Sequence, residues 1–228
     1  MELYAIPVVA EARQWLFRLP LRERERALAI GHARARAQFV VGRLAVRALL
    51  GERLGLPLAE VDLRTGPAGA PELAGADWNF NISHAGNWAV VALCRGLPVG
   101  IDIESLRPFA DALQVARQHL HRDEQAWLLS IPAACRSTAF LRLWVCKEAV
   151  IKAARRGLWM RLDDWVALSA APHGEPFEVV DGDLRPWRIH PFDICPRHVG
   201  ALASSSETNV VTATRVTLEA LMNRGDPA

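Results

Sequence analysis

The chain alternates between segments with a helical hydrophobic repeat and shorter segments with the two-residue alternation typical of strands. Apolar, partly β-branched residues at 3–9 predict a first, buried strand. Residues 22–53 carry apolar positions on a helical repeat, with a break expected at Gly31. Gly55 and Pro57, which follow this segment, are typical helix-stopping residues. The chain is therefore expected to begin with one strand and a broken helix.

Turn residues and alternation predict three strands in the middle of the chain. The turns 84–87 (HAGN) and 95–98 (RGLP) each contain a glycine, which supplies the backbone freedom that tight turns need. Residues 65–77 are rich in Gly, Pro and Ala and are expected to form a loop. The predicted strands span 78–82, 88–94 and 99–104.

The later part of the chain again has helices followed by strands. A helix is predicted over 110–129, closed off by Pro132. A second helix is expected to be capped by Ser137 or Thr138 and to run to about residue 156, before Gly157. Strands are predicted at 165–169, 177–180, 187–189, 199–203 and 210–216, before a polar end that is expected to fray.

A break in the pattern at Arg107-Pro108 marks the expected boundary between two halves of the chain. These halves are residues 1–106 and residues 107–228. Helix followed by strands occurs once in each half, which indicates a pseudo-twofold arrangement.

Two carboxylates stand out in the strand pattern VGIDIE. Because side chains alternate along a strand, Asp102 and Glu104 are expected on one face and Ile101 and Ile103 on the other, core-facing side. The two acids would then lie roughly 7 Å apart, two strand steps. Such a pair can hold one hard cation. The alternative is that they are only the solvated face of an edge strand.

A third acid and a lysine belong to the helical stretch WVCKEAVIK. Trp144, Glu148 and Lys152 follow each other at four-residue intervals and so form one stripe on a helix. With the two strand acids and His84, they make a candidate site for a divalent metal and a phosphate group. The alternatives are a surface Glu–Lys pair worth about 0.3–0.5 kcal/mol, a core tryptophan and a histidine that only belongs to its turn.

Composition excludes several other classes of protein. A net charge of +2 is too small to indicate nucleic acid, and no apolar run is long enough for a membrane-spanning helix. The four cysteines lack CxxC spacing, so neither a zinc site nor a disulfide framework is indicated. With no basic region at the amino terminus, we expect a reduced, cytoplasmic protein. Of the basic residues only Lys147 and Lys152 are lysines, and both lie in the candidate site stretch.

The motifs in their order resemble a known family. NISHAG, then GIDIE, then WVCKEAVIK at these separations are similar to the Sfp-type 4′-phosphopantetheinyl transferases, most closely over residues 64–158. The resemblance implies an α+β pseudo-dimer of two similar halves with the site in the cleft between them. It implies transfer of the phosphopantetheine arm of coenzyme A to a serine of an acyl or peptidyl carrier protein, with release of adenosine 3′,5′-bisphosphate.

Site roles also follow from this resemblance. Asp102, Glu104 and Glu148 would bind Mg²⁺, and Glu148 would also act as base toward the incoming serine. Ser83 and His84 would contact the coenzyme A phosphates, and Lys152 the pyrophosphate. Arg34 and Arg64 fall near positions where relatives place basic residues for the nucleotide.

The chain departs from the family pattern at two positions. Gly69-Ala70-Pro71 lacks the basic residue that relatives carry between the glycine and the proline, and Gln38 stands where some relatives have arginine. Both changes bear on coenzyme A affinity and neither touches the expected metal ligands.

We interpret the sequence as a monomeric, Mg²⁺-dependent phosphopantetheinyl transferase that needs no membrane or nucleic acid. One alternative is a non-catalytic module that binds coenzyme A or a carrier protein. The other is a nucleic-acid binder that uses the arginines and eight tryptophans, but the tryptophans are dispersed among apolar residues.

Overall fold

The protein is described by a computed structural model, in which the chain forms two compact units. Unit 1 consists of Met1–Gly96 together with Val211–Ala228, and unit 2 of Leu97–Val210. The structure describes residues 1–66, 69–156, 160–169, 174–205 and 213–224. None of the helices in these ranges is both long enough and apolar enough to cross a membrane.

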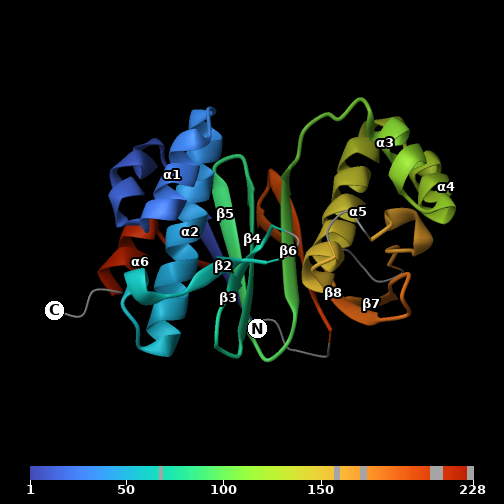
Figure 1. Cartoon of the computed structure of the whole chain (residues 1–228). Helices are drawn as coiled ribbons and strands as arrows, with labels where there is room; N and C mark the ends of the chain where they lie inside the picture. The colour runs from blue at the N-terminus through green and yellow to red at the C-terminus, as the bar shows by residue number, and fades with distance from the viewer. Residues whose placement is uncertain (67–68, 157–159, 170–173, 206–212, 225–228) are drawn as a thin grey trace. The chain divides into compact units, whose positions relative to one another are not determined.

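Unit 1 packs one long helix against a mostly antiparallel sheet with the strand order β10-β1-β5-β4 (Figure 1). Its core combines residues of α2, such as Leu44 and Leu49, with Phe80 and Val91 of the sheet. The elements are β1 (Glu2–Pro7), η1 (Ala10–Arg18), α1 (Leu21–Ala29), α2 (Ala33–Leu54), η2 (Leu58–Glu60), β2 (Leu63–Thr65), β3 (Pro71–Leu73), β4 (Trp78–Ala85), β5 (Trp88–Arg95), β10 (Thr214–Arg215) and α6 (Leu218–Arg224).

The elements predicted for unit 1 are largely confirmed. The helix breaks near Gly31, and α2 ends at Gly55, whose left-handed backbone (φ 65°) a glycine adopts without strain. Two predictions were wrong. The expected loop 65–77 contains strand β3, which pairs with β2. The expected frayed end forms α6, because Leu218, Leu221 and Met222 bury their side chains in the core of unit 1.

Unit 2 has the same kind of architecture, with α5 packed on an antiparallel sheet of order β6-β9-β8-β7. Helices α3 and α4 lie beside α5 (Figure 1). The elements are β6 (Val99–Ser105), α3 (Ala112–His119), α4 (Arg122–Ser130), α5 (Ala133–Ala154), η4 (Leu162–Asp164), β7 (Phe177–Val180), β8 (Pro186–Cys195) and β9 (His198–Ser204). Helices and mainly antiparallel sheets in both units confirm the predicted α+β class.

The helix predicted over 110–129 is two helices, because His121 starts a new one. Its Nδ1 accepts a hydrogen bond from the Asp123 backbone N–H, and its own N–H donates to the Glu124 carboxylate at 3.0 Å. This reciprocal pair is a capping box, which satisfies backbone groups at a helix start. The break thus separates α3 from α4.

Helix α5 begins earlier than predicted. It starts after Pro132, which fits the first position of a helix, and not at Ser137 or Thr138. The Ser137 hydroxyl instead accepts a hydrogen bond from the Phe109 backbone N–H at 3.0 Å. Arg155, in the left-handed conformation, ends α5, and Gly157 lies outside the described residues.

Residues 165–169 are not the predicted strand. The segment is held to the helices by polar contacts, because the Ala167 backbone N–H donates to the Glu124 carboxylate at 2.7 Å. The remaining strands predicted for unit 2 are confirmed, although β8 is longer than expected. Of the strand predicted at 210–216, residues 210–212 lie outside the described part and 214–215 form β10.

The two units divide the chain at a different place from the expected boundary at residue 106. Strand β6 pairs along its whole length with β9, so residues 97–106 belong to unit 2. Strand β10 pairs with β1, so the end of the chain returns to unit 1. Pairing between strands distant in sequence therefore decides the division.

Candidate active site

The candidate site is built where helix α5 meets strand β6 in unit 2. A side chain at Gly100 would overlap the carbonyl oxygen of Ala149 and the backbone nitrogen of Ala153. Glycine therefore permits the close approach of α5 to β6. This packing places the C-terminal half of α5, with Glu148 and Lys152, beside the acids of β6.

The acids of β6 lie on the face of the sheet that meets α5. Asp102 and Glu104 share this face with Gly100 because side chains alternate along the strand. Their register partners on β9 belong to the core of unit 2 that includes α5. Ile101 and Ile103 are buried on the opposite face. The predicted alternation and the burial of the isoleucines are confirmed, although neither isoleucine belongs to the core cluster that packs around α5.

Lys152 and Asp102 form a close ion pair between α5 and β6. The Lys152 ammonium donates to Asp102 Oδ1 at 2.6 Å. The Asp102 side chain is only 8% exposed and that of Lys152 is 29% exposed, so the pair is partly shielded from water. The packing of α5 on β6 thus brings the lysine of the helix into direct contact with an acid of the strand.

The carboxylates influence one another electrostatically. Burial raises the pKa of Glu148, and the negative charges of Asp102 and Glu104 raise it further, against the opposing charge of Lys152. Burial likewise raises the pKa of Glu104, and Asp102 adds to the effect, while Arg107 and Lys152 oppose it. The fold therefore brings three acids and one lysine close enough to interact.

These acids are not arranged as a finished metal site. In the described part of the chain, no group of three or more His, Cys, Asp or Glu side chains is placed to hold an ion. The chemistry of the donors nevertheless fits Mg²⁺, which prefers carboxylate oxygens and keeps several waters. A cation would also offset the repulsion that raises the pKa of Glu104 and Glu148.

The other predicted site residues belong to unit 1. Ser83 and His84 are neighbours on β4, so their side chains point to opposite faces: Ser83 is buried and His84 is exposed. Arg34 is exposed in the first turn of α2. Arg64 is exposed on β2, where it pairs with Asp62 at 2.7 Å. The roles predicted for these four residues stay predictions.

The two positions that depart from the family pattern have structural surroundings of their own. Gln38 is buried, and its side-chain amide donates to the Gly86 carbonyl oxygen at 2.9 Å. Gln38 therefore holds the turn that follows His84. The Ala70 carbonyl oxygen accepts a hydrogen bond from the Gly66 backbone N–H at 2.8 Å and so closes the β2–β3 connection.

Sequence analysis missed the role of Lys147. Its side chain is fully buried, and its ammonium pairs with Glu124 at 2.9 Å and donates to the carbonyl oxygens of Leu162 and Trp165. Lys147 thus ties α4, η4 and the residue that follows η4 to α5. Its side chain points away from the stripe formed by Glu148 and Lys152. The sequence offered one signal of this different role: Lys147 does not fit the four-residue spacing of the stripe.

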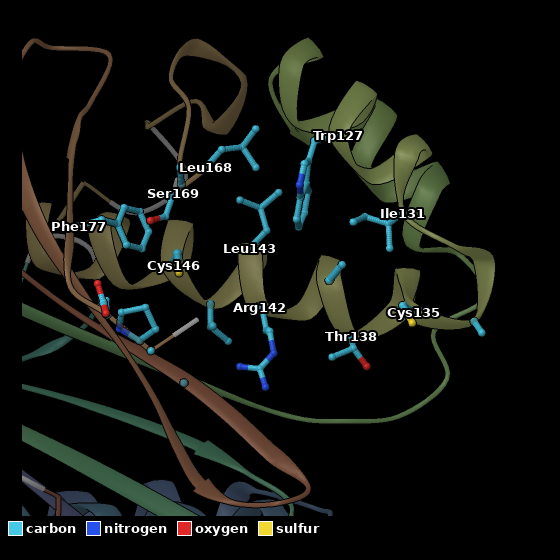
Figure 2. A pocket seen from close by; sticks show the side chains of 18 residues that line it. Trp127, Ile131, Cys135, Thr138, Arg142, Leu143, Cys146, Leu168, Ser169 and Phe177 are labelled. Carbon is cyan, nitrogen blue, oxygen red and sulfur yellow. The ribbon is translucent and has the colours of Figure 1, made fainter. Parts of the chain in front are cut away.

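An apolar cavity of about 510 Å³ lies along the N-terminal half of α5. Figure 2 shows Trp127 of α4 and Leu143 of α5 pointing into it, with Phe177 of β7 on another side. Arg142, which also lines it, pairs with Asp193 at 3.2 Å. Sequence analysis did not find this cavity, because its walls come from segments far apart in the chain.

The fold and the site define a protein of two α+β units, one of which carries a cluster of acids and a lysine. Comparisons with known proteins show to which family such a protein belongs. A family model described as the 4′-phosphopantetheinyl transferase superfamily matches residues 98–203. A second model, 4′-phosphopantetheinyl transferase, N-terminal, matches residues 6–95.

Individual relatives carry the same name. The 4′-phosphopantetheinyl transferase Sfp of Bacillus subtilis is 26% identical, covering 88% of both chains. The transferase psf-1 of Bacillus pumilus is 27% identical over 81% of this chain and 78% of its own. HetI of a Nostoc strain is 35% identical, over 54% of each chain. The chain belongs to the 4′-phosphopantetheinyl transferase superfamily and is of the Sfp type.

Proposed function

We propose that the protein transfers the 4′-phosphopantetheine arm of coenzyme A to a serine of an acyl or peptidyl carrier protein. The observation that carries this proposal is the cluster of Asp102, Glu104, Glu148 and Lys152 where α5 crosses β6. It lies within the segment that matches the transferase superfamily. The reaction converts an apo carrier to its holo form and releases adenosine 3′,5′-bisphosphate.

The reaction is a displacement at phosphorus. The serine oxygen forms a bond to the phosphorus that carries the pantetheine arm, and the bond from this phosphorus to the bridging oxygen of the pyrophosphate breaks. The leaving group is adenosine 3′,5′-bisphosphate. The serine proton needs an acceptor, and negative charge grows on the leaving phosphate.

Glu148 is the proposed acceptor of the serine proton. A base works best when its pKa lies near the working pH, and burial and the neighbouring acids raise the pKa of Glu148 toward that range. Lys152 is proposed to contact the pyrophosphate, where an ammonium stabilises developing negative charge. Its bond to Asp102 fixes where the ammonium lies.

Asp102, Glu104 and Glu148 would hold Mg²⁺. When bound, the ion neutralises phosphate charge and orients the displacement. Ser83 and His84 are proposed to contact the coenzyme A phosphates. Arg34 and Arg64 are proposed to contact its nucleotide, and both guanidinium groups are exposed in unit 1.

The proposed setting is a cytoplasmic monomer that acts on carriers of fatty acid, polyketide or nonribosomal peptide synthesis. A non-catalytic binding module is not favoured, because all three acids and Lys152 are present and adjacent. A protein that only bound coenzyme A would not need a partly buried cluster of like charges, which costs stability.

Intact-mass analysis tests the proposal. Purified apo carrier proteins of several types are incubated with the protein, coenzyme A and Mg²⁺. We expect at least one carrier to gain one phosphopantetheine mass, and a carrier whose acceptor serine is alanine to gain none. Unchanged masses across the whole panel at saturating coenzyme A would overturn the proposed activity.

A further inference from the structure

Three polar side chains form a row across neighbouring strands of unit 2. Ser105 of β6 lies opposite His198 of β9, which in turn lies opposite Cys195 of β8. Side chains directly opposite each other on antiparallel strands share one face, with Cβ atoms about 4.5–5.5 Å apart. His198 Nδ1 is 3.1 Å from Cys195 Sγ, and His198 Nε2 is 3.0 Å from Ser105 Oγ. One imidazole therefore links a thiol to a hydroxyl.

This row is separate from the proposed transfer site. Ser105 follows Glu104 in the chain, but alternation along β6 turns its side chain to the opposite face, which it shares with Ile103. The carboxylates face α5, whereas the row lies on the other side of the sheet. The proposed transfer reaction has no role for Cys195 or His198.

A β-bulge brings the thiol to the histidine. Asp193 pairs with Val199, and the next pair is Cys195 with His198, so β8 contains one extra residue, Ile194. Without this irregularity Ile194 would lie opposite His198. Ile194 is instead buried, at 3% exposure. Bulges commonly re-aim a side chain next to a functional site, and this one replaces an apolar neighbour of the imidazole with a thiol.

The contacts match those of an activated thiol nucleophile. A neutral imidazole donates from one nitrogen and accepts at the other. If Nε2 donates to Ser105 Oγ, Nδ1 is the acceptor nitrogen, and it lies 3.1 Å from the Cys195 thiol, whose proton it can take. A nucleophile bonded to a base that a third group orients is the arrangement used in covalent catalysis. We propose that Cys195 is a nucleophilic thiol that reacts with low-molecular-weight disulfides.

The step balances as thiol–disulfide exchange. His198 Nδ1 takes the proton from Cys195, and the thiolate attacks one sulfur of the disulfide RS–SR. A new bond forms between Cys195 Sγ and that sulfur while the S–S bond breaks, and the leaving thiolate RS⁻ takes the proton back from His198. Cys195 is oxidised to a mixed disulfide, and the departing sulfur is reduced to a thiol. Ser105 is a positioning residue in this step.

The other cysteines provide an internal comparison. Cys94 and Cys146 are buried, and burial raises the pKa of Cys146 to about 12, so it stays protonated. Cys135 is exposed near the start of α5 (Figure 2), and no histidine bonds its thiol among the described contacts. Exposure alone predicts that Cys135 reacts first, because Cys195 is only partly exposed. The Cys195–His198 contact predicts the reverse order.

The test uses the full chain, reduced and freed of reductant, with bis(2-hydroxyethyl) disulfide at pH 7. This probe is uncharged, so neighbouring arginines do not attract it. Acid-quenched samples are digested, and the gain in mass is followed at each cysteine over time. We expect Cys195 to react about tenfold faster than Cys135 or more, as for thiols paired with a histidine. Equal rates, or a faster Cys135, would overturn the proposal.

Variants separate activation from accessibility. His198→Asn should lower the rate at Cys195 to that at Cys135 or below it, because Cys195 is the less exposed thiol, and should leave Cys135 unchanged. Ser105→Ala should slow Cys195 several-fold, and Ser105→Thr, which keeps the hydroxyl, should restore it. His119→Asn, at the exposed end of α3, is the matched control and should change neither rate. An unchanged Cys195 rate in folded His198→Asn would contradict the proposal, and the wild-type comparison decides it even if that variant does not fold.

Discussion

The buried ion pair between Lys147 and Glu124 allows a quantitative test of how unit 2 is held together. Both side chains are 0% exposed, and the ammonium also donates to the carbonyl oxygens of Leu162 and Trp165, each at 2.6 Å. The Glu124 carboxylate accepts hydrogen bonds from the backbone N–H groups of His121 and Ala167. The pair therefore joins three segments of the chain at one point.

Replacing only the lysine should be severe. Lys147→Met keeps most of the side-chain volume but leaves the Glu124 carboxylate buried without its counter-charge and two carbonyl oxygens without their donor. Breaking one partner of a buried pair costs about 3–5 kcal/mol. Lys147→Met with Glu124→Met removes both charges but leaves two N–H groups and two carbonyl oxygens without their partners, so we expect it to cost less than the sum of the two single variants.

Urea unfolding followed by tryptophan fluorescence measures these differences in the free energy of unfolding. The matched control is Arg188→Met, which breaks the exposed pair with Glu178 on the same unit and should cost less than about 1 kcal/mol. The reasoning is refuted if Lys147→Met costs no more than this control. It is also refuted if the costs of the single variants simply add in the double variant, because partners in contact must be coupled.

Three further predictions concern the candidate active site. Lys152→Ala should lower kcat by about 100-fold or more, as for a lost oxyanion donor, whereas a mere surface pair would leave steady-state kcat near normal. Ionised Glu148 destabilises the fold because its folded-state pKa is raised, so Glu148→Gln should raise the melting temperature at pH 7. This gain should vanish in thermal scans below about pH 4, where both folded and unfolded chains are protonated; a gain that persists there would have another cause. Ala70→Lys should lower KM for coenzyme A several-fold with kcat little changed, and the effect should shrink with added salt, because an exposed charge contact supplies uniform binding. An unchanged KM at both salt concentrations would show that the loop does not reach the ligand.

Local patterns predicted most of the elements correctly. Alternation located β6, and the helical stripe placed Glu148 and Lys152 on one helix. Part of what failed depends on contacts between distant residues: the tail forms α6 because the core of unit 1 covers its apolar side chains. The break at His121 is local, because its capping partner Glu124 lies only three residues further on, but a histidine stands where Ser or Thr is the usual cap.

The site shows the same limit. The sequence indicates which residues carry chemistry, but not that Gly100 lets α5 approach the face of β6 on which the acids lie. It also does not indicate that Lys147, next to Glu148 in the chain, is buried in an ion pair with Glu124 on the other side of α5 from the site. The bulge at Ile194 is likewise invisible in the sequence, because an extra residue shows only against the paired strand.

The measurement that tests the central claim most directly is the intact mass of one apo carrier after a single incubation with coenzyme A and Mg²⁺. Wild-type protein, Asp102→Asn and the control Glu178→Gln are compared, with folding of each confirmed by thermal unfolding. We predict that wild type and Glu178→Gln add one phosphopantetheine to the carrier serine, and that Asp102→Asn adds almost none. Full modification by folded Asp102→Asn, or none by wild type, would contradict the account.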